Sequence, residues 1–134
     1  MCSILGLFEI PAGRTGLRGL ALQASRRQRH RGPDWSGIYV HDRAVIAHER
    51  LAIVDVESGA QPLLSPDGRQ ILGVNGEIYN HRRLRDECGD YAFQTGSDCE
   101  VILALYRRFG TGFLHKLNGI FAFVLYDEQA GRYL

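Results

Sequence analysis

Cysteine is scarce in this sequence, and the spacing of the few that occur excludes two common uses of the residue. Cys2, Cys88 and Cys99 are an odd number and include no Cys-x-x-Cys pair. A disulfide-held secreted domain carries an even set, and a tetrahedral zinc site draws on closely spaced pairs. We therefore expect no disulfide framework and no metal site, and we predict a reducing, cytoplasmic compartment.

Long hydrophobic runs and an excess of one charge are also missing. The first apolar run, residues 3–10, is too short for a signal peptide and lacks its basic flank, and no run reaches the length of a membrane span. Sixteen Lys and Arg against fifteen Asp and Glu leave a net charge of +1. No overall field attracts nucleic acid or an anionic membrane, so we expect neither as a partner.

The apolar pattern predicts strands grouped around a few helices. A chain of 134 residues fits one compact domain with a single core. Strands are expected at 2–10, 37–40, 44–55, 69–80, 119–127 and from 132, and helices within 14–32, at 80–88 and at 97–110. Ser97 and Glu100 predict a capping box at the start of the third helix. Grouped strands, without βαβ alternation, favour an α+β fold of stacked layers.

Cys2 stands out because it directly follows the initiator methionine. Removal of Met1 would leave a thiol and a free α-amino group on one residue. The two groups ordinarily ionise within about one unit of each other, so at neutral pH the amine can take the thiol's proton. Cys2 is therefore a candidate nucleophile with its own base. The alternative is a small, inert residue at the start of a buried strand.

A nucleophile that attacks a carbonyl needs donors for the oxyanion that forms. Asn75 and Gly76, in "VNGEIYN", offer a side-chain amide and a backbone N–H that glycine allows to approach closely. They are candidates for an oxyanion hole. The same dipeptide between apolar runs is also the strongest short signal for a hairpin turn, and the sequence leaves both interpretations open.

Arg50 and Asp98 are charged residues that are candidates for binding the charged groups of a ligand. Arg50 interrupts an apolar strand, where a guanidinium needs an acidic partner, and Asp98 lies in the first turn of a helix, where the helix dipole alone would favour it. Together they could bind the carboxylate and the ammonium of a free amino acid. A competing Cys–His site would use His48, although the terminal amine already supplies a base.

Seven stretches occur in the order in which one enzyme family carries them: "MCSILG", "HRGPDWSG", "HERLAIVD", "GAQPL", "VNGEIYN", "TGSDCEVIL" and "LNGIFAFVLYD". They resemble the glutamine amidotransferase domain of bacterial-type asparagine synthetase, a class II amidotransferase of the N-terminal nucleophile hydrolase superfamily. Class II enzymes of purine and glucosamine-phosphate synthesis differ after "RG" and "NG". Ser3 departs from the glycine common after the nucleophile in this class.

The resemblance implies a role for each of the candidate residues. Cys2 would be the nucleophile, and Asn75 and Gly76 would form the oxyanion hole. The glutamine ligands would be Arg50, Glu77, Asp98 and backbone groups of Ile53 and Val54. L-Glutamine is then the expected substrate, and no cofactor is expected in this chain.

The resemblance also implies an architecture and a larger enzyme. The expected fold is an αββα sandwich of two antiparallel sheets flanked by helices, and residues 1–134 would be a type 2 glutamine amidotransferase domain truncated at its C-terminus. The missing synthetase domain would use ATP and Mg²⁺, and the full-length enzyme would form a homodimer. The alternative is an inactive glutamine-binding or structural fragment, because missing strands leave sheet edges exposed.

Overall fold

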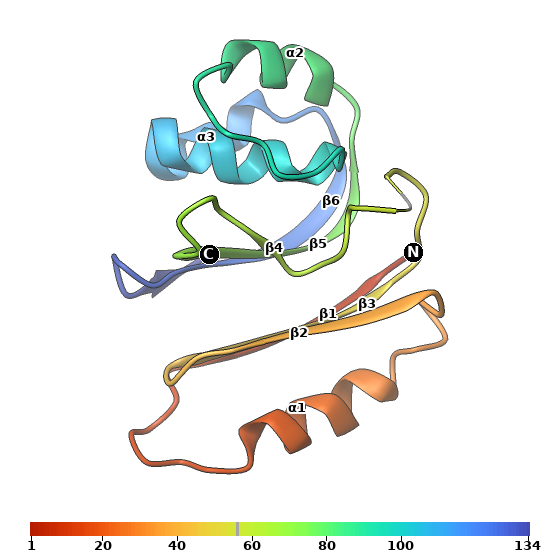
Figure 1. Cartoon of the computed structure of the whole chain (residues 1–134), viewed down its shortest axis with the longest axis vertical. Coiled ribbons are helices and arrows are strands. Elements are labelled where there is room, and N and C mark those ends of the chain that lie inside the picture. Colours follow the sequence, from red (N-terminus) through yellow and green to blue (C-terminus); the bar gives the residue numbers. More distant parts are fainter. Residues whose placement is uncertain (56) are drawn as a thin grey trace.

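The computed structural model describes residues 1–55 and 57–134 and arranges them in four layers (Figure 1). One helix covers a three-stranded sheet, a four-stranded sheet stacks on that, and two helices cover the far side. The elements are β1 Ser3–Phe8, α1 Leu17–Arg26, β2 Trp35–Val40, β3 Ala44–Arg50, β4 Leu63–Leu64, β5 Gln70–Ile78, α2 His81–Glu87, η1 Asp98–Glu100, α3 Val101–Phe109, η2 Gly110–Lys116, β6 Gly119–Asp127 and β7 Arg132–Tyr133. This is the expected αββα sandwich.

The first sheet places β3 between β1 and β2, with antiparallel pairing on each side. All of β3 is buried because its two faces meet different layers. Val45 packs with Ala21 of α1, whereas Ile46 packs with Ile71 of the second sheet. A strand covered on both faces favours a continuous apolar run, and Ala44–Ala47 form such a run in the first half of this strand.

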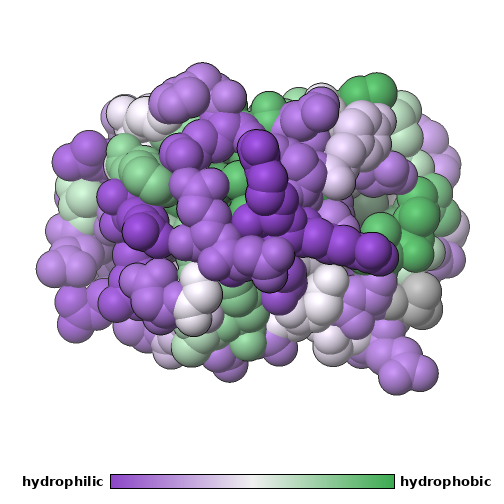
Figure 2. All heavy atoms as spheres, turned by 90° about the horizontal axis from the view of Figure 1, so that it is seen from above, coloured by the Kyte–Doolittle hydropathy of each residue, from purple (hydrophilic) through white to green (hydrophobic). Residues whose placement is uncertain are grey.

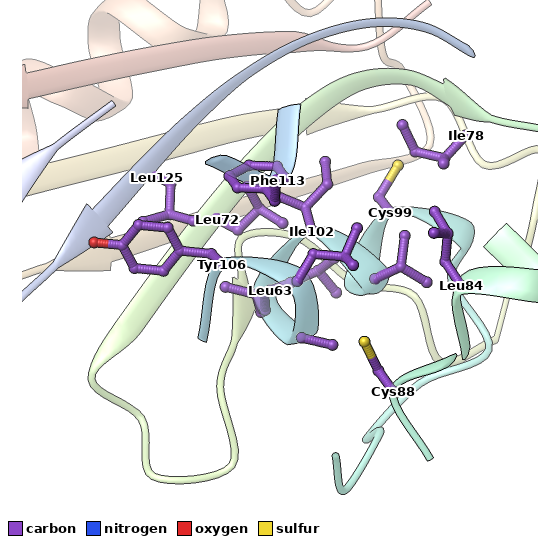
Figure 3. Packing of buried hydrophobic residues seen from close by; sticks show 14 of the residues in the cluster. Leu63, Leu72, Ile78, Leu84, Cys88, Cys99, Ile102, Tyr106, Phe113 and Leu125 are labelled. Carbon is purple, nitrogen blue, oxygen red and sulfur yellow. The ribbon is translucent and has the colours of Figure 1, made fainter. Parts of the chain in front are cut away.

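The second sheet has the order β4-β5-β6-β7, and α2 and α3 cover its outer face. Here the main hydrophobic core lies between β5, β6 and the helices (Figure 3). Leu72 of β5, Leu125 of β6 and Phe113 of η2 are among its fully buried side chains. β5 therefore contacts the first sheet through one face and the helices through the other.

The outer layer of helices presents polar side chains to solvent. Arg82, Arg83, Asp86 and Glu87 of α2 are exposed, while Leu84 is buried. Figure 2 shows hydrophilic residues across the centre of this face, with hydrophobic residues in separate groups. None of the helices in the described part of the chain is long and apolar enough to cross a membrane.

The predicted strand at 44–55 is too long. β3 ends at Arg50, and residues 51–53 have no regular structure. The apolar side chains that made this segment resemble a strand are not all in the core, since Ile53 is 62% exposed. The short β4 strand was not predicted, because two residues carry no periodicity. The other expected strands and helices are confirmed, with ends shifted by a few residues.

The predicted capping box is only half right. The Ser97 hydroxyl accepts a hydrogen bond from the Cys99 N–H and so caps the first turn. Glu100 does not return the bond to Ser97 in the structure. Its buried carboxylate instead accepts from the backbone N–H groups of Gln94 and Thr95 and from the Thr95 hydroxyl. Glu100 therefore fixes the segment that precedes the helix.

Asn75 and Gly76 lie inside β5, opposite Ala122 and Phe121 of β6. The hairpin-turn interpretation is therefore wrong. Gly76 has φ +152°, and an added Cβ would lie 2.1 Å from the Ile120 carbonyl oxygen. The dipeptide thus marks a place where two backbones approach closely within a sheet.

Replacing Gly76 with alanine is expected to destabilise the fold by about 2–4 kcal/mol, because the new Cβ meets backbone atoms and the φ angle is strained. Gly68→Ala is the matched control, since Gly68 has φ +72° with nothing within 4 Å of the added Cβ. Its expected cost is about 1 kcal/mol. Urea unfolding measures both, and equal losses for the two variants would contradict a close approach at Gly76.

Candidate active site

Cys2 lies immediately before β1, and its thiol is held at the end of β3. The Leu51 N–H donates to the sulfur at 3.3 Å, and the sulfur lies 3.6 Å from the Leu51 carbonyl oxygen. The Arg31 Nε donates to the Cys2 carbonyl at 3.1 Å. Cys2 is half-buried and carries a free thiol. Its backbone is therefore fixed while its sulfur still faces a cavity.

Cys2 lines three cavities, and two adjoining ones among them contain all eight residues to which the resemblance assigns a role. The larger has a volume of about 190 Å³ and the smaller about 30 Å³. The eight nominated residues among their linings are Cys2, Arg50, Ile53, Val54, Asn75, Gly76, Glu77 and Asp98. The thiol thus connects a wider space with a narrow one. Met1, which is 70% exposed, also lines the larger cavity.

β5 forms the wall of these cavities that carries the candidate oxyanion donors. Asn75 lines the larger cavity, and Gly76 and Glu77 line both. Gly76 is exposed and has no side chain, so its backbone is accessible. Asn75 and Gly76 therefore line the same cavity as Cys2.

Arg50 and Asp98 bring opposite charges to the smaller cavity, and each is only 6% exposed. The Arg50 Nη2 donates to the carbonyl oxygens of Val54 at 3.0 Å and Asp55 at 2.6 Å. Asp98 Oδ2 accepts from the Ile78 N–H at 2.7 Å. Two buried, opposite charges that line one small cavity suit a ligand that carries one charge of each sign. Arg50 also anchors residues 51–55, a role that the sequence did not reveal.

Cys99 lines the smaller cavity and was not nominated from the sequence. It is 2% exposed, and its thiol lies 3.8 Å from the Gly76 carbonyl oxygen as a donor. Burial raises the pKa of Cys99 well above its usual range, and the Asp98 carboxylate raises it further. Burial also raises the pKa of Cys88. Figure 3 shows these two cysteines within the packed core, so neither is a competing nucleophile.

His48 does not take part in a Cys–His pair at these cavities. It is fully buried and lines neither of them. Its Nε2 lies 2.7 Å from the Val74 carbonyl oxygen, and burial lowers its pKa, which favours the neutral ring. Within residues 1–55 and 57–134 no three His, Cys, Asp or Glu side chains are grouped to hold a metal ion.

The chain belongs to the glutamine amidotransferase domain family, whose model matches residues 1–134. The four-layered fold and the position of Cys2 in one cavity with the candidate oxyanion donors of β5 agree with that membership. Among solved structures it is similar to a glutamine phosphoribosylpyrophosphate amidotransferase from Bacillus subtilis, complexed with ADP and GMP. The TM-score is 0.70 at 23% identity, over 96% of this chain and 35% of that one. The fold class is thereby confirmed.

Within this family the chain is similar to asparagine synthetases. It is 61% identical over 135 residues to the glutamine-hydrolysing asparagine synthetase B of Escherichia coli strain K12. The aligned region covers all of this chain and 24% of the relative. It is 52% identical over 130 residues to a probable glutamine-hydrolysing asparagine synthetase of Schizosaccharomyces pombe, with 96% and 23% covered. The chain thus spans about a quarter of the length of these relatives.

Proposed function

We propose that this chain releases ammonia from the side chain of L-glutamine, with Cys2 as the nucleophile. The observation that carries the proposal is the meeting of three features at the cavities described above. These are the Cys2 thiol, the donors of Asn75 and Gly76, and the buried charge pair of Arg50 and Asp98. Together they fit an amino acid whose side-chain carboxamide reaches the thiol.

The chemistry starts once Met1 is removed, which frees the α-amino group of Cys2. That amine takes the thiol proton, and the sulfur attacks the glutamine amide carbon. The C–N bond then breaks, and the proton held by the amine leaves with ammonia. Water adds to the γ-glutamyl thioester, the C–S bond breaks, and glutamate leaves with the thiol restored. Small residues such as cysteine at position 2 permit removal of the methionine, and Met1 is exposed.

The oxyanion of the tetrahedral intermediate would be bound by the Asn75 side-chain amide and the Gly76 N–H. Donors that are already oriented need no reorganisation when charge develops, so they stabilise the transition state more than the ground state. β5 provides that orientation, because it is hydrogen-bonded to β6 along its length and packed on both faces.

The head group of glutamine would occupy the smaller cavity. Arg50 would bind the α-carboxylate and Asp98 the α-ammonium, while Glu77 and the backbone of Ile53 and Val54 complete the wall. The side chain of the substrate then extends toward Cys2, which lines both cavities.

For the whole protein we propose a glutamine-hydrolysing asparagine synthetase, on the basis of the similarity to relatives of that name. A synthetase domain outside this chain would use ATP and Mg²⁺ to activate aspartate, and ammonia from this domain would complete the amide. We propose a homodimer of the full-length enzyme in the cytoplasm, a compartment that suits three free cysteines.

The test is ammonia release from glutamine by purified protein whose intact mass shows that Met1 is absent. The proposal predicts turnover that saturates with glutamine. Isothermal titration of glutamine is run in parallel. Binding without ammonia release would instead favour a glutamine-binding module, and neither binding nor release would favour a structural fragment.

Asp98→Asn and Arg50→Lys are expected to weaken glutamine binding more than they destabilise the fold. Each removes a charge-assisted contact, which costs about 1.5–3 kcal/mol of binding, or roughly 10–150-fold in Kd. An asparagine at position 98 still offers an oxygen to the Ile78 N–H, so its stability loss stays small.

Isothermal titration and thermal unfolding separate the two effects. Asp86→Asn, an exposed change on α2, is the control and should alter neither. An unchanged Kd together with a lowered melting temperature would mean that Arg50 and Asp98 are structural.

A further inference from the structure

We propose that Asp55, which lines neither cavity, is a positioning residue that fastens the loop of residues 51–55 to the segment just before Asp98. The role rests on the proposed function, because both joined segments line the cavity assigned to the glutamine head group. Val54 lines it from the loop, and Ser97 and Asp98 line it from the segment that follows Gly96.

Loop 51–55 has little packing of its own to hold it in place. Ile53 is 62% exposed and Val54 is 38% exposed. Asp55 adopts φ +52°, a left-handed conformation that costs a non-glycine residue energy and persists only when surrounding contacts impose it. Its carbonyl oxygen accepts from Arg50 Nη2 at 2.6 Å and from the Gly59 N–H at 3.0 Å. The backbone of Asp55 is therefore fixed by these two contacts.

The Asp55 carboxylate reaches a segment 41 residues further along the chain. Asp55 Oδ2 accepts from the Gly96 N–H at 2.8 Å and from the Ser58 hydroxyl at 2.5 Å. The approach is close, since a Cβ on Gly96 would lie 3.2 Å from the Asp55 carboxyl carbon. Donation from Ser58 lowers the pKa of Asp55, so the carboxylate is ionised at neutral pH.

The segment that receives Asp55 is itself firmly held. The buried Glu100 carboxylate accepts from the Gln94 and Thr95 N–H groups at 2.7 and 2.8 Å. Arg85 of α2 donates to the carbonyl oxygens of Thr95 and Ser97 at 2.7 and 2.9 Å. Asp55 therefore connects a weakly packed loop to a rigid support, and the contact sets the width of the cavity between them.

Loss of this contact should affect substrate affinity more than chemistry, because the oxyanion donors lie on β5 and the thiol, directly before β1, contacts Leu51 at the β3 end of the loop. We expect Asp55→Ala to raise the Kd for glutamine about tenfold or more, with kcat at saturating glutamine within about threefold of the parent. Asp55→Asn retains an acceptor for the Gly96 N–H and should restore part of the affinity.

Asp67→Ala is the matched control. Asp67 makes the same kind of contacts in the β4–β5 turn, where it accepts from the Ser65 hydroxyl at 2.6 Å and the Arg69 N–H at 3.1 Å, and it lines neither cavity. Its removal should lower the melting temperature about as much as Asp55→Ala while leaving the Kd for glutamine unchanged.

Isothermal titration, steady-state kinetics and hydrogen exchange at Gly96 form the test. Faster exchange at Gly96 with a raised Kd in Asp55→Ala supports the role. If the parent binds glutamine and the Kd of Asp55→Ala lies within twofold of the parent value, the positioning role of Asp55 is overturned and the proposed function is unaffected. Unchanged hydrogen exchange at Gly96 in Asp55→Ala has the same consequence. A parent that neither binds nor hydrolyses glutamine overturns the proposed function and this role with it.

Discussion

Replacement of Cys2 with alanine is expected to reduce ammonia release from glutamine at least about 10³-fold while the fold is retained, because it removes the nucleophile and little else. Cys2 is half-buried, and its sulfur contacts only the backbone of Leu51 among the hydrogen bonds described for it. The loss of packing is therefore small. Initial rates of ammonia release and the melting temperature measure the two effects separately.

Cys88→Ala is the control, because Cys88 is buried in the helix-covered core and lines neither of the cavities at Cys2. It should lose some stability but keep its activity. A variant with one extra residue fused before Cys2 should be as inactive as Cys2→Ala, since an acylated amine is no longer a base. Turnover by Cys2→Ala near that of the parent would overturn the mechanism.

Asn75→Ala is expected to lower kcat by about 10²–10³-fold, because one of two donors to the developing oxyanion is lost. The effect on KM should be smaller, since the ground-state carbonyl carries less charge. Asn75 sits inside β5 and not in a turn, so no turn is lost with the amide. The expected loss of stability is about 1 kcal/mol or less.

The control for this variant is Asn118→Ala, an exposed asparagine that lines neither cavity at Cys2. Its kcat should match that of the parent. A kcat of Asn75→Ala within a few-fold of the parent value would show that Asn75 is not part of the oxyanion hole, whatever the effect of the substitution on stability.

The layers of the fold could be predicted because the pattern of apolar residues in each segment indicates which of its faces are buried. β3 and β5 each contain a short apolar run, Ala44–Ala47 and Ile71–Val74, and each strand is covered on two faces. The end of β3 could not be predicted in the same way. Leu51 and Ile53 are apolar because they line a cavity, and a cavity wall and a strand interior draw on the same residue types.

The candidate site was predictable residue by residue from short motifs, whereas its supports were not. The Asn75-Gly76 dipeptide was compatible with a hairpin turn and with an oxyanion hole, and only the pairing of β5 with β6 excludes the turn. The contact of Asp55 with Gly96 joins residues 41 positions apart, so neither sequence neighbourhood carries a sign of it. Glu100 matched the local pattern of a capping box, yet its carboxylate accepts hydrogen bonds from the N–H and the hydroxyl of Thr95.

The central claim is that glutamine reacts covalently at Cys2, and the most direct measurement is site-resolved labelling with a glutamine analogue whose side chain ends in an electrophilic ketone. Peptide mass spectrometry then locates the adduct among the three cysteines. We expect one adduct per chain, on Cys2, that excess glutamine prevents and that Cys2→Ala abolishes. An adduct on Cys88 or Cys99, or ammonia release from glutamine without any adduct on Cys2, would contradict the claim.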